Sequence, residues 1–116
     1  RSDAVGLAAG DLRHRVTVQR IVQRERSAVG QSKPEWQDDA MRWARVEDLS
    51  AGMVWKAGAV GTRVKTMVTL REPFECRPLE TRFRFEERGR VRVLGVVDVR
   101  RRPEADYVEC FCAEAA

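Results

Sequence analysis

Residues 10–20, Gly-Asp-Leu-Arg-His-Arg-Val-Thr-Val-Gln-Arg, give the first indication of the fold. Read with a period of two residues, this stretch separates into an apolar face and a polar face. The apolar face carries Leu12, His14, Val16 and Val18, and the polar face carries Arg13, Arg15, Thr17 and Gln19. Because successive side chains of a strand point to opposite sides of a sheet, the pattern predicts a half-buried β-strand over residues 12–22, opened by a glycine.

Two further strands are expected in the first part of the chain. Residues 40–47 have Met41, Trp43, Ala44 and Val46 as their apolar side chains. Alternation is poor there, which fits either burial on both sides or a β-bulge. Residues 62–71 give the cleanest alternation, with the apolar face Val64, Thr66, Val68 and Leu70 opposite Arg63, Lys65, Thr69 and Arg71.

Three more strands follow, each preceded by a turn. Residues 81–86 place Phe83 and Phe85 inward and Arg82 and Arg84 outward, and residues 87–90 form a tight turn in which Gly89 adopts positive φ. In residues 91–99, one face collects Val91, Val93, Val97 and Val99. In residues 105–113, one face collects Val108, Cys110 and Cys112, with Tyr107, Glu109 and Phe111 on the other.

Short strands joined by turns predict an all-β fold, a small antiparallel β-barrel or sandwich of about six strands. One short helix, or a loop ordered by a partner, is expected over residues 49–61, where Ser50 can cap a helix that Gly52, Gly58 and Gly61 weaken. The length of 116 residues supports a single domain over residues 10–116 behind a flexible tail at residues 1–9.

The charge balance is mildly basic, with 22 Lys and Arg against 18 Asp and Glu. Such a balance permits contact with a polyanion without requiring it. The three cysteines, Cys76, Cys110 and Cys112, form an odd set typical of free thiols in a reducing compartment. No stretch approaches the roughly 18 apolar residues of a membrane span, so no membrane is expected among the partners.

Catalytic groups are scarce. His14 is the single histidine and falls on an apolar strand face, where a satisfied, partly buried ring is expected. The Cys110-Phe111-Cys112 stretch lacks the second cysteine or histidine pair of a zinc site, and no glycine-rich loop is followed by Lys and Ser or Thr. We therefore expect no enzyme activity, no catalytic residue, no metal and no cofactor.

Three sets of residues are candidates for binding. The outward basic residues of the strands either form a DNA-contacting face or are solvated charges balanced by neighbouring acids; they are Arg13, Arg15, Arg63, Lys65, Arg82 and Arg84, with Arg90, Arg92 and Arg100 also assigned outward. An apolar, glycine-rich segment either anchors a partner or packs on the domain's own core; its residues are Met53, Val54, Trp55, Lys56 and Val60. A polar loop over residues 23–34 is either a solvated hairpin loop or a docking loop; its candidates are Arg24, Arg26, Gln31 and Lys33.

Several short motifs occur in an order that resembles a known family. They are Gly10-x-Leu-Arg-His-Arg-Val-x-Val-Gln, Gly30-Gln31 before Trp36, Trp43-Ala44-Arg45-Val46-Glu47 with Leu49-Ser50, Thr81-Arg82-Phe83-Arg84-Phe85 through Gly89-Arg90, and Val93 to Asp98. Over residues 10–113 the chain resembles the head-tail adaptor or head-closure proteins (stoppers, head-tail connectors) of siphophages, prophages and gene transfer agents. It departs from that family after Leu49-Ser50, where Ala51-Gly52-Met53 replace more helix-forming residues.

The resemblance implies a non-enzymatic subunit with a barrel-like fold that assembles into a homo-oligomeric ring in the virion neck. Such a ring lies between the portal and adaptor above and the tail terminator or tail tube below. It retains the packaged double-stranded DNA and offers the tail a docking surface, after assembly in the cytoplasm of the bacterial host.

Two alternatives remain open from the sequence. The first is another neck or tail component such as a tail terminator, which shares small β architecture. The second is a β-barrel that binds DNA without sequence specificity, which the basic strand faces would support. Aromatic side chains are absent from the basic face, so recognition by base stacking is not favoured.

Overall fold

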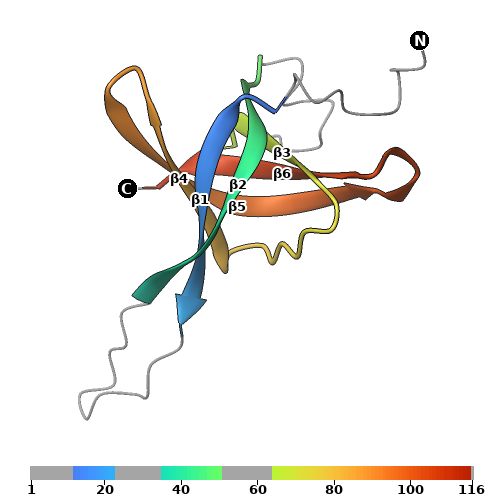
Figure 1. The fold of residues 1–116 in the computed structure, drawn as a ribbon, viewed down its shortest axis with the longest axis horizontal. Coiled ribbons are helices and arrows are strands. Elements are labelled where there is room, and N and C mark those ends of the chain that lie inside the picture. The colour runs from blue at the N-terminus through green and yellow to red at the C-terminus, as the bar shows by residue number, and fades with distance from the viewer. Residues whose placement is uncertain (1–11, 23–34, 51–63, 116) are drawn as a thin grey trace.

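A computed structural model describes residues 12–22, 35–50 and 64–115. Their regular elements are β1 (His14–Val22), β2 (Glu35–Asp48), β3 (Thr66–Arg71), β4 (Thr81–Glu87), β5 (Arg90–Arg102), the short 3₁₀ helix η2 (Pro103–Ala105) and β6 (Tyr107–Glu114). The strands close into a barrel in the order β1-β2-β3-β6-β5-β4, and every neighbouring pair is antiparallel. In Figure 1, β1 and β2 run steeply across the view while β5 and β6 run nearly horizontally, as opposite walls of a barrel do.

The expected all-β fold is therefore confirmed, and of the two architectures considered it is the barrel. Closure leaves no unpaired sheet edge among the described strands, which removes the edges that invite aggregation. The tail at residues 1–9 and most of the helix expected within residues 49–61 lie outside the described residues, which do not include 1–11 and 51–63. The two described residues of that segment, Leu49 and Ser50, are not helical.

The core fills the barrel mainly from alternate strand positions, which the sequence pattern places correctly in β1, β4 and β6. Val16 and Val18 are fully buried, and Phe83 and Phe85 are buried while Arg84 is exposed. The inward face of β6 is also confirmed, since its residues Val108, Cys110 and Cys112 are fully buried. Two outward residues are nevertheless covered: Phe111 lies beneath the Arg100 guanidinium at 5.3 Å, and Thr69, expected to face out, is buried between its ladder partners Arg45 and Glu109.

The strand β2 contains a β-bulge and carries apolar side chains on its outer face. Val18 pairs with Ala40 and Gln19 pairs with Asp38, so Asp39 is an extra residue on β2. The bulge precedes residues 40–47, whose pairing is regular, so it does not account for the poor alternation there. Burial on both sides is wrong for Met41 and Trp43, each 55% exposed. Only Ala44 on this stretch is fully buried among the four apolar residues named from the sequence.

The face assigned to β5 is corrected by its pairing with β4. Directly paired residues of an antiparallel ladder share a face, and Leu94 pairs with the buried Phe83 while Arg92 pairs with the buried Phe85. Leu94 and Val96 therefore enter the core, whereas Val91 is 67% exposed and Val97 is 36% exposed. A second bulge, at Val97, shifts the register between Val96 and Asp98. Arg92, expected to face outward, lies at the inner face.

Candidate protein-interaction surface

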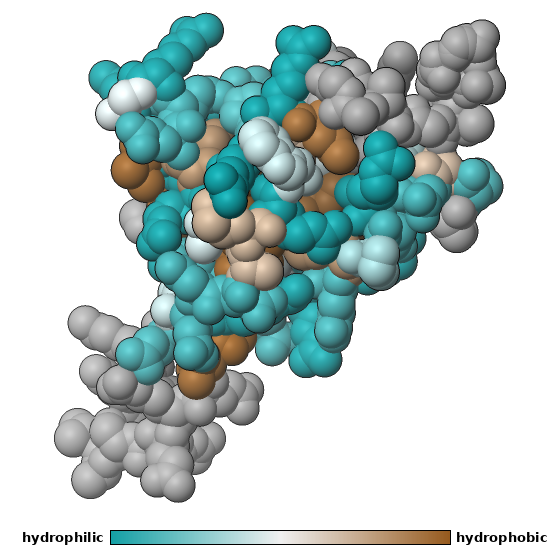
Figure 2. All heavy atoms as spheres, in the orientation of Figure 1, coloured by the Kyte–Doolittle hydropathy of each residue, from teal (hydrophilic) through white to brown (hydrophobic). Residues whose placement is uncertain are grey.

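Two large apolar side chains lie exposed together on the outer face of β2. Met41 and Trp43 are two residues apart and pair with Thr17 and Arg15 of β1. We call Met41 and Trp43 the β2 outer patch. Large apolar side chains are usually buried, so a pair left on one strand face is a candidate contact site for another protein. Figure 2 shows one face of the molecule, which is mostly hydrophilic with small apolar areas between hydrophilic ones.

Next to this patch, a polar network joins three strands. Gln19 of β1 donates to Asp38 of β2 at 2.7 Å, Arg84 of β4 donates to the other oxygen of Asp38 at 3.2 Å, and Arg82 donates to Gln19 at 2.6 Å. The Arg82 guanidinium also stacks on Trp36 at 4.5 Å. The Gln19 hydrogen bond, followed by the charges of Arg84 and Arg82, lowers the pKa of Asp38. Arg82 and Arg84 are therefore already engaged by other residues of the same chain.

The remaining predicted basic residues lie nearer the end where β1 begins. Arg13 and Arg15 are exposed on β1 and just before it, and Lys65 is exposed just before β3. Within the part of the chain that the structure describes, Arg15 and Lys65 have no carboxylate at ion-pair distance. Arg13 borders a shallow pocket of about 360 Å³ with His14, Arg45 and Val46.

The other candidates from the sequence are not among the described residues. Arg63 lies in residues 51–63, as do Met53, Val54, Trp55, Lys56 and Val60. The loop candidates lie in residues 23–34; they are Arg24, Arg26, Gln31 and Lys33.

Arg92 caps one end of the barrel. Its guanidinium donates to Glu87 at 3.2 Å and to Glu114, lies 3.4 Å from Asp48, and stacks over Phe85 at 5.5 Å. Burial alone would lower the pKa of Arg92, but the Glu114 hydrogen bond and the surrounding carboxylates raise it. This end joins the ends of β2, β4 and β6, so its charges fasten strands that are distant in sequence.

His14 belongs to the same end. Its Nε2 lies 3.0 Å from a Glu87 oxygen, and its ring meets Phe85 edge to face at 5.7 Å. The partly buried ring expected from the sequence is confirmed, but it is only half satisfied, because Nδ1 is buried without a hydrogen-bond partner. Among the described residues, no nucleophilic side chain is hydrogen-bonded to this ring.

The connection between β3 and β4, residues 72–80, closes the opposite end. Figure 1 shows it, in yellow, passing along the lower end of the barrel before β4 begins. Its Phe74 and Cys76 are buried, and Arg20 and Arg42 stack on Phe74 at 5.4 and 5.2 Å. Arg42 donates to the carbonyls of Arg71 and Pro73, while Arg101 binds Glu72 and the carbonyl of Phe74.

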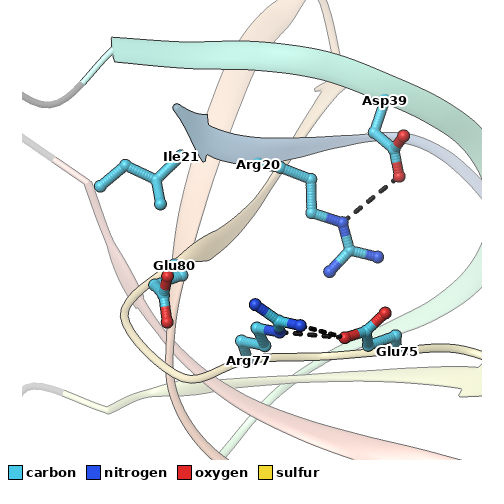
Figure 3. A pocket seen from close by; sticks show the side chains of 6 residues that line it. All are labelled: Arg20, Ile21, Asp39, Glu75, Arg77 and Glu80. Carbon is cyan, nitrogen blue, oxygen red and sulfur yellow. Dashed lines mark hydrogen bonds and ion pairs between the residues drawn. The ribbon is translucent and has the colours of Figure 1, made fainter. Parts of the chain in front are cut away.

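A shallow pocket of about 310 Å³ lies beside this connection, lined by Arg20, Ile21, Asp39, Glu75, Arg77 and Glu80. Figure 3 shows its charges facing one another in pairs. Arg20 lies 3.3 Å from Asp39, and Arg77 lies 2.8 Å from Glu75. Since these cations and anions neutralise each other at the surface, the pocket offers little to a charged small ligand.

Other kinds of site were considered over residues 12–22, 35–50 and 64–115. In these ranges no group of three or more His, Cys, Asp or Glu is placed to hold a metal ion. No helix in the same ranges has the length and apolar character to cross a membrane. What the described surface does offer is an apolar patch and charged strand faces, which suit association with another macromolecule.

Comparison with known proteins identifies the family. The sequence profile of the phage head completion proteins matches residues 7–115. The chain belongs to the phage head completion protein family. The resemblance to head-closure and adaptor proteins is thereby confirmed, and the chain is a structural component of a phage head that contacts other head or tail proteins.

A solved structure agrees with the fold. The solution structure of a Shigella flexneri 2a protein superposes with a TM-score of 0.72 and 22% sequence identity, covering 95% of this chain and 98% of that one. At this identity the likeness concerns the fold alone. A search of curated protein sequences gave no significant match.

The β2 outer patch and the Arg92 cap escaped prediction from the sequence. The signal for the patch was present, since Trp36, Met41 and Trp43 are interspersed with charged residues on one strand. Without the pairing of β2 with β1, however, the outward and inward residues of β2 could not be separated. For Arg92 the sequence held no signal, because its three carboxylate neighbours come from β2, β4 and the end of β6.

Proposed function

We propose that this protein is a head-closure component of the virion neck, which forms a homo-oligomeric ring between the portal and adaptor and the tail. The ring retains packaged double-stranded DNA and presents a docking surface to the tail. Membership of the phage head completion family over residues 7–115 is the observation that carries the proposal. The role is structural rather than enzymatic, and the particle is that of a phage, a prophage or a gene transfer agent.

Two exposed apolar areas on opposite walls of the barrel support ring assembly. A ring of identical subunits needs two different, complementary surfaces on each subunit. In the order β1-β2-β3-β6-β5-β4, β2 and β5 stand on opposite walls. β2 exposes Met41 and Trp43, and β5 exposes Val91 and Val97. Contact between the β2 outer patch of one copy and β5 of the next would bury both areas.

Sequence-independent contact with DNA is assigned to the basic residues near the start of β1. Arg15 and Lys65 are exposed, and neither forms an ion pair with a carboxylate within the described residues. Arg13 lies two residues before Arg15, at the same end of the barrel. Phosphate contacts of this kind need no base recognition. Arg82 and Arg84 are weaker candidates, because Gln19, Asp38 and Trp36 already engage them.

The two remaining candidate segments are assigned to partner contacts on sequence grounds. Residues 53–60 would provide an apolar anchor, through Trp55 above all, for the adaptor or the tail. Residues 24–33 would supply polar and basic contacts from the β1–β2 connection.

Electron microscopy of particles from a producing strain that lacks this gene tests the proposal. Empty or DNA-leaking heads beside separate, complete tails are expected, with normal particles restored by the gene supplied in trans. Normal tailed particles in the deletion strain would refute a neck role. Heads that keep their DNA beside tails of uncontrolled length would instead identify a tail terminator.

A binding titration separates the DNA-binding alternative. If the protein acts chiefly as a DNA-binding barrel, the free subunit binds duplex DNA with micromolar affinity, and the affinity falls steeply as salt rises. If DNA is contacted only by the assembled ring, the free subunit binds weakly even at low salt.

A further inference from the structure

Two buried thiols meet where the barrel is closed by residues 72–80. Cys76 belongs to this connection and Cys110 belongs to β6, 34 residues further along the chain. The Cys110 thiol donates a hydrogen bond to the Cys76 sulfur, and the two sulfur atoms are 3.4 Å apart. No disulfide joins them, since all three cysteines are free. A disulfide has its sulfur atoms about 2.0 Å apart, so a small side-chain movement would bring them to bonding distance.

The surroundings of the pair distinguish its two members. Cys76 keeps 7% of its surface exposed, whereas Cys110 is fully buried. The hydrogen bond from Cys110, aided by the positive charges of Arg20 and Arg101, lowers the pKa of Cys76 despite its burial. The same hydrogen bond and burial raise the pKa of Cys110. Cys76 is therefore the sulfur that attacks an oxidant, and Cys110 is the sulfur that resolves the product.

Cys112 is excluded as the partner by its own contacts. It lies two residues beyond Cys110 on the same strand face, and its thiol donates to the Cys110 carbonyl at 3.4 Å. Burial raises the pKa of Cys112 strongly, which keeps it an unreactive thiol.

We propose that Cys76 and Cys110 are an oxidation site that forms an intramolecular disulfide with hydrogen peroxide and so fastens residues 72–80 to β6. The Cys76 thiolate attacks one peroxide oxygen, the O–O bond breaks, and the departing hydroxide takes the proton that Cys76 had released, which gives a sulfenic acid and one water. The Cys110 sulfur then attacks the Cys76 sulfur, the S–O bond breaks, and the departing hydroxide takes the Cys110 proton to become water. In total, two thiols are oxidised and one peroxide is reduced to two waters.

The linkage strengthens the closed end of the barrel. It ties the segment that carries Phe74, over which Arg20 and Arg42 stack, to the strand β6. Joining residues 34 positions apart also reduces the conformational freedom of the unfolded chain. The site does not depend on the proposed neck function, because it requires only the folded subunit.

The test treats the purified, reduced protein with hydrogen peroxide and follows three quantities. Intact mass is expected to fall by two hydrogen atoms, two of the three thiols are expected to disappear in a titration of the denatured protein, and peptide mapping is expected to link Cys76 with Cys110. The midpoint of thermal unfolding is expected to rise by roughly 5–15 °C, and a thiol reductant should reverse the rise.

Variants with matched controls complete the test. Cys112→Ala is expected to form the linkage as the wild type does, whereas Cys76→Ala and Cys110→Ala gain no stability from peroxide; circular dichroism checks that each variant folds. Three titratable thiols in the treated wild type would overturn the proposal. So would a linkage through Cys112, a dimer linked between two chains, or a sulfinic acid at Cys76 beside a free Cys110.

Discussion

Arg92 shows how one charged side chain is kept at the inner face of the barrel. Its side chain is only 19% exposed, yet it reaches carboxylates of Glu87, Asp48 and Glu114 and covers the ring of Phe85. A buried charge is tolerated when it is paired and hydrogen-bonded, and its removal leaves the partners uncompensated. This end of the barrel is therefore covered by a paired charge above the ring of Phe85.

Arg92→Ala is expected to lower the free energy of unfolding by about 1–2 kcal/mol, because three carboxylates then face one another with no cation between them. The measurement is urea unfolding followed by circular dichroism. Arg90→Ala is the control, since Arg90 is exposed on the same strand; it should change stability by less than about 0.5 kcal/mol. Equal effects of the two substitutions would contradict the role given to Arg92.

The hairpin between β4 and β5 is an element whose turn sets its register. Arg88 and Gly89 both have positive φ, at 53° and 78°, as a tight two-residue hairpin turn requires. The turn was foreseen from the sequence, and it fixes the pairing of Phe83 with Leu94 and of Phe85 with Arg92. The register in turn decides which residues of β5 enter the core.

Gly89→Ala is expected to destabilise the protein by about 1–2 kcal/mol, because a side chain strains a residue held at positive φ although the added carbon would meet open space. Gly95→Ala is the matched control on the same hairpin. Its added carbon would lie 3.9 Å from the Ala113 carbonyl, an ordinary contact, and its φ needs no glycine. Thermal unfolding of both variants should show a loss at Gly89 and little change at Gly95.

The polar network across β1, β2 and β4 links stability to pH. Since the pKa of Asp38 is lower in the folded protein than its ordinary value of 3.8, the carboxylate stabilises the fold above that value. This contribution is lost as the pH falls through the folded-state pKa. The acid-sensitive element is thus the junction where Gln19 and Arg84 hold Asp38.

Asp38→Asn is expected to be less stable than the wild type near neutral pH, and the difference should shrink as the pH falls below about 4. Urea unfolding at several pH values measures this change. Glu86→Gln, which alters an exposed carboxylate on β4, should leave the pH dependence as it is in the wild type. If the free energies of unfolding of Asp38→Asn and the wild type differ by the same amount at every pH, the charge of the Asp38 carboxylate is not the cause of the lower stability.

For the whole molecule, the exposed walls of the barrel matter more than any pocket. The pocket beside residues 72–80 is shallow and lined by paired charges, while β2 and β5 leave large apolar side chains uncovered on opposite sides. Exposed apolar side chains of this kind are candidate contacts for another protein. The family assignment and the exposed apolar side chains thus agree on association with other head or tail proteins.

Trp43→Glu is expected to abolish restoration of normal particles in the deletion strain while changing the free energy of unfolding by less than about 1 kcal/mol, because Trp43 is already half exposed. Electron microscopy of the complemented strain and urea unfolding of the purified variant measure the two effects. Leu79→Asp, at another exposed apolar residue, is the control and should restore particles. Normal particles in the strain complemented with Trp43→Glu would show that the β2 outer patch is not needed for assembly.

Much of the fold follows from the sequence, because alternation is a local property. The period of two in residues 12–18 and 81–86 was enough to place Val16, Val18, Phe83 and Phe85 in the core, and turn residues separated the strands. The order of short motifs was enough to indicate the family. Candidates in residues 23–34 and 51–63 stay predictions, since they lie outside the described residues.

Tertiary structure decided what depends on the partner strand. The pairing of β2 with β1 and of β5 with β4 decides which side of each strand faces the core, so Met41 and Trp43 point outward and Arg92 inward. The contact of Cys76 with Cys110 spans 34 residues and exists only because residues 72–80 fold under the barrel. Local periodicity alone determined the strands, whereas closure of the barrel, through long-range register, determined which side chains are left for partners and for chemistry.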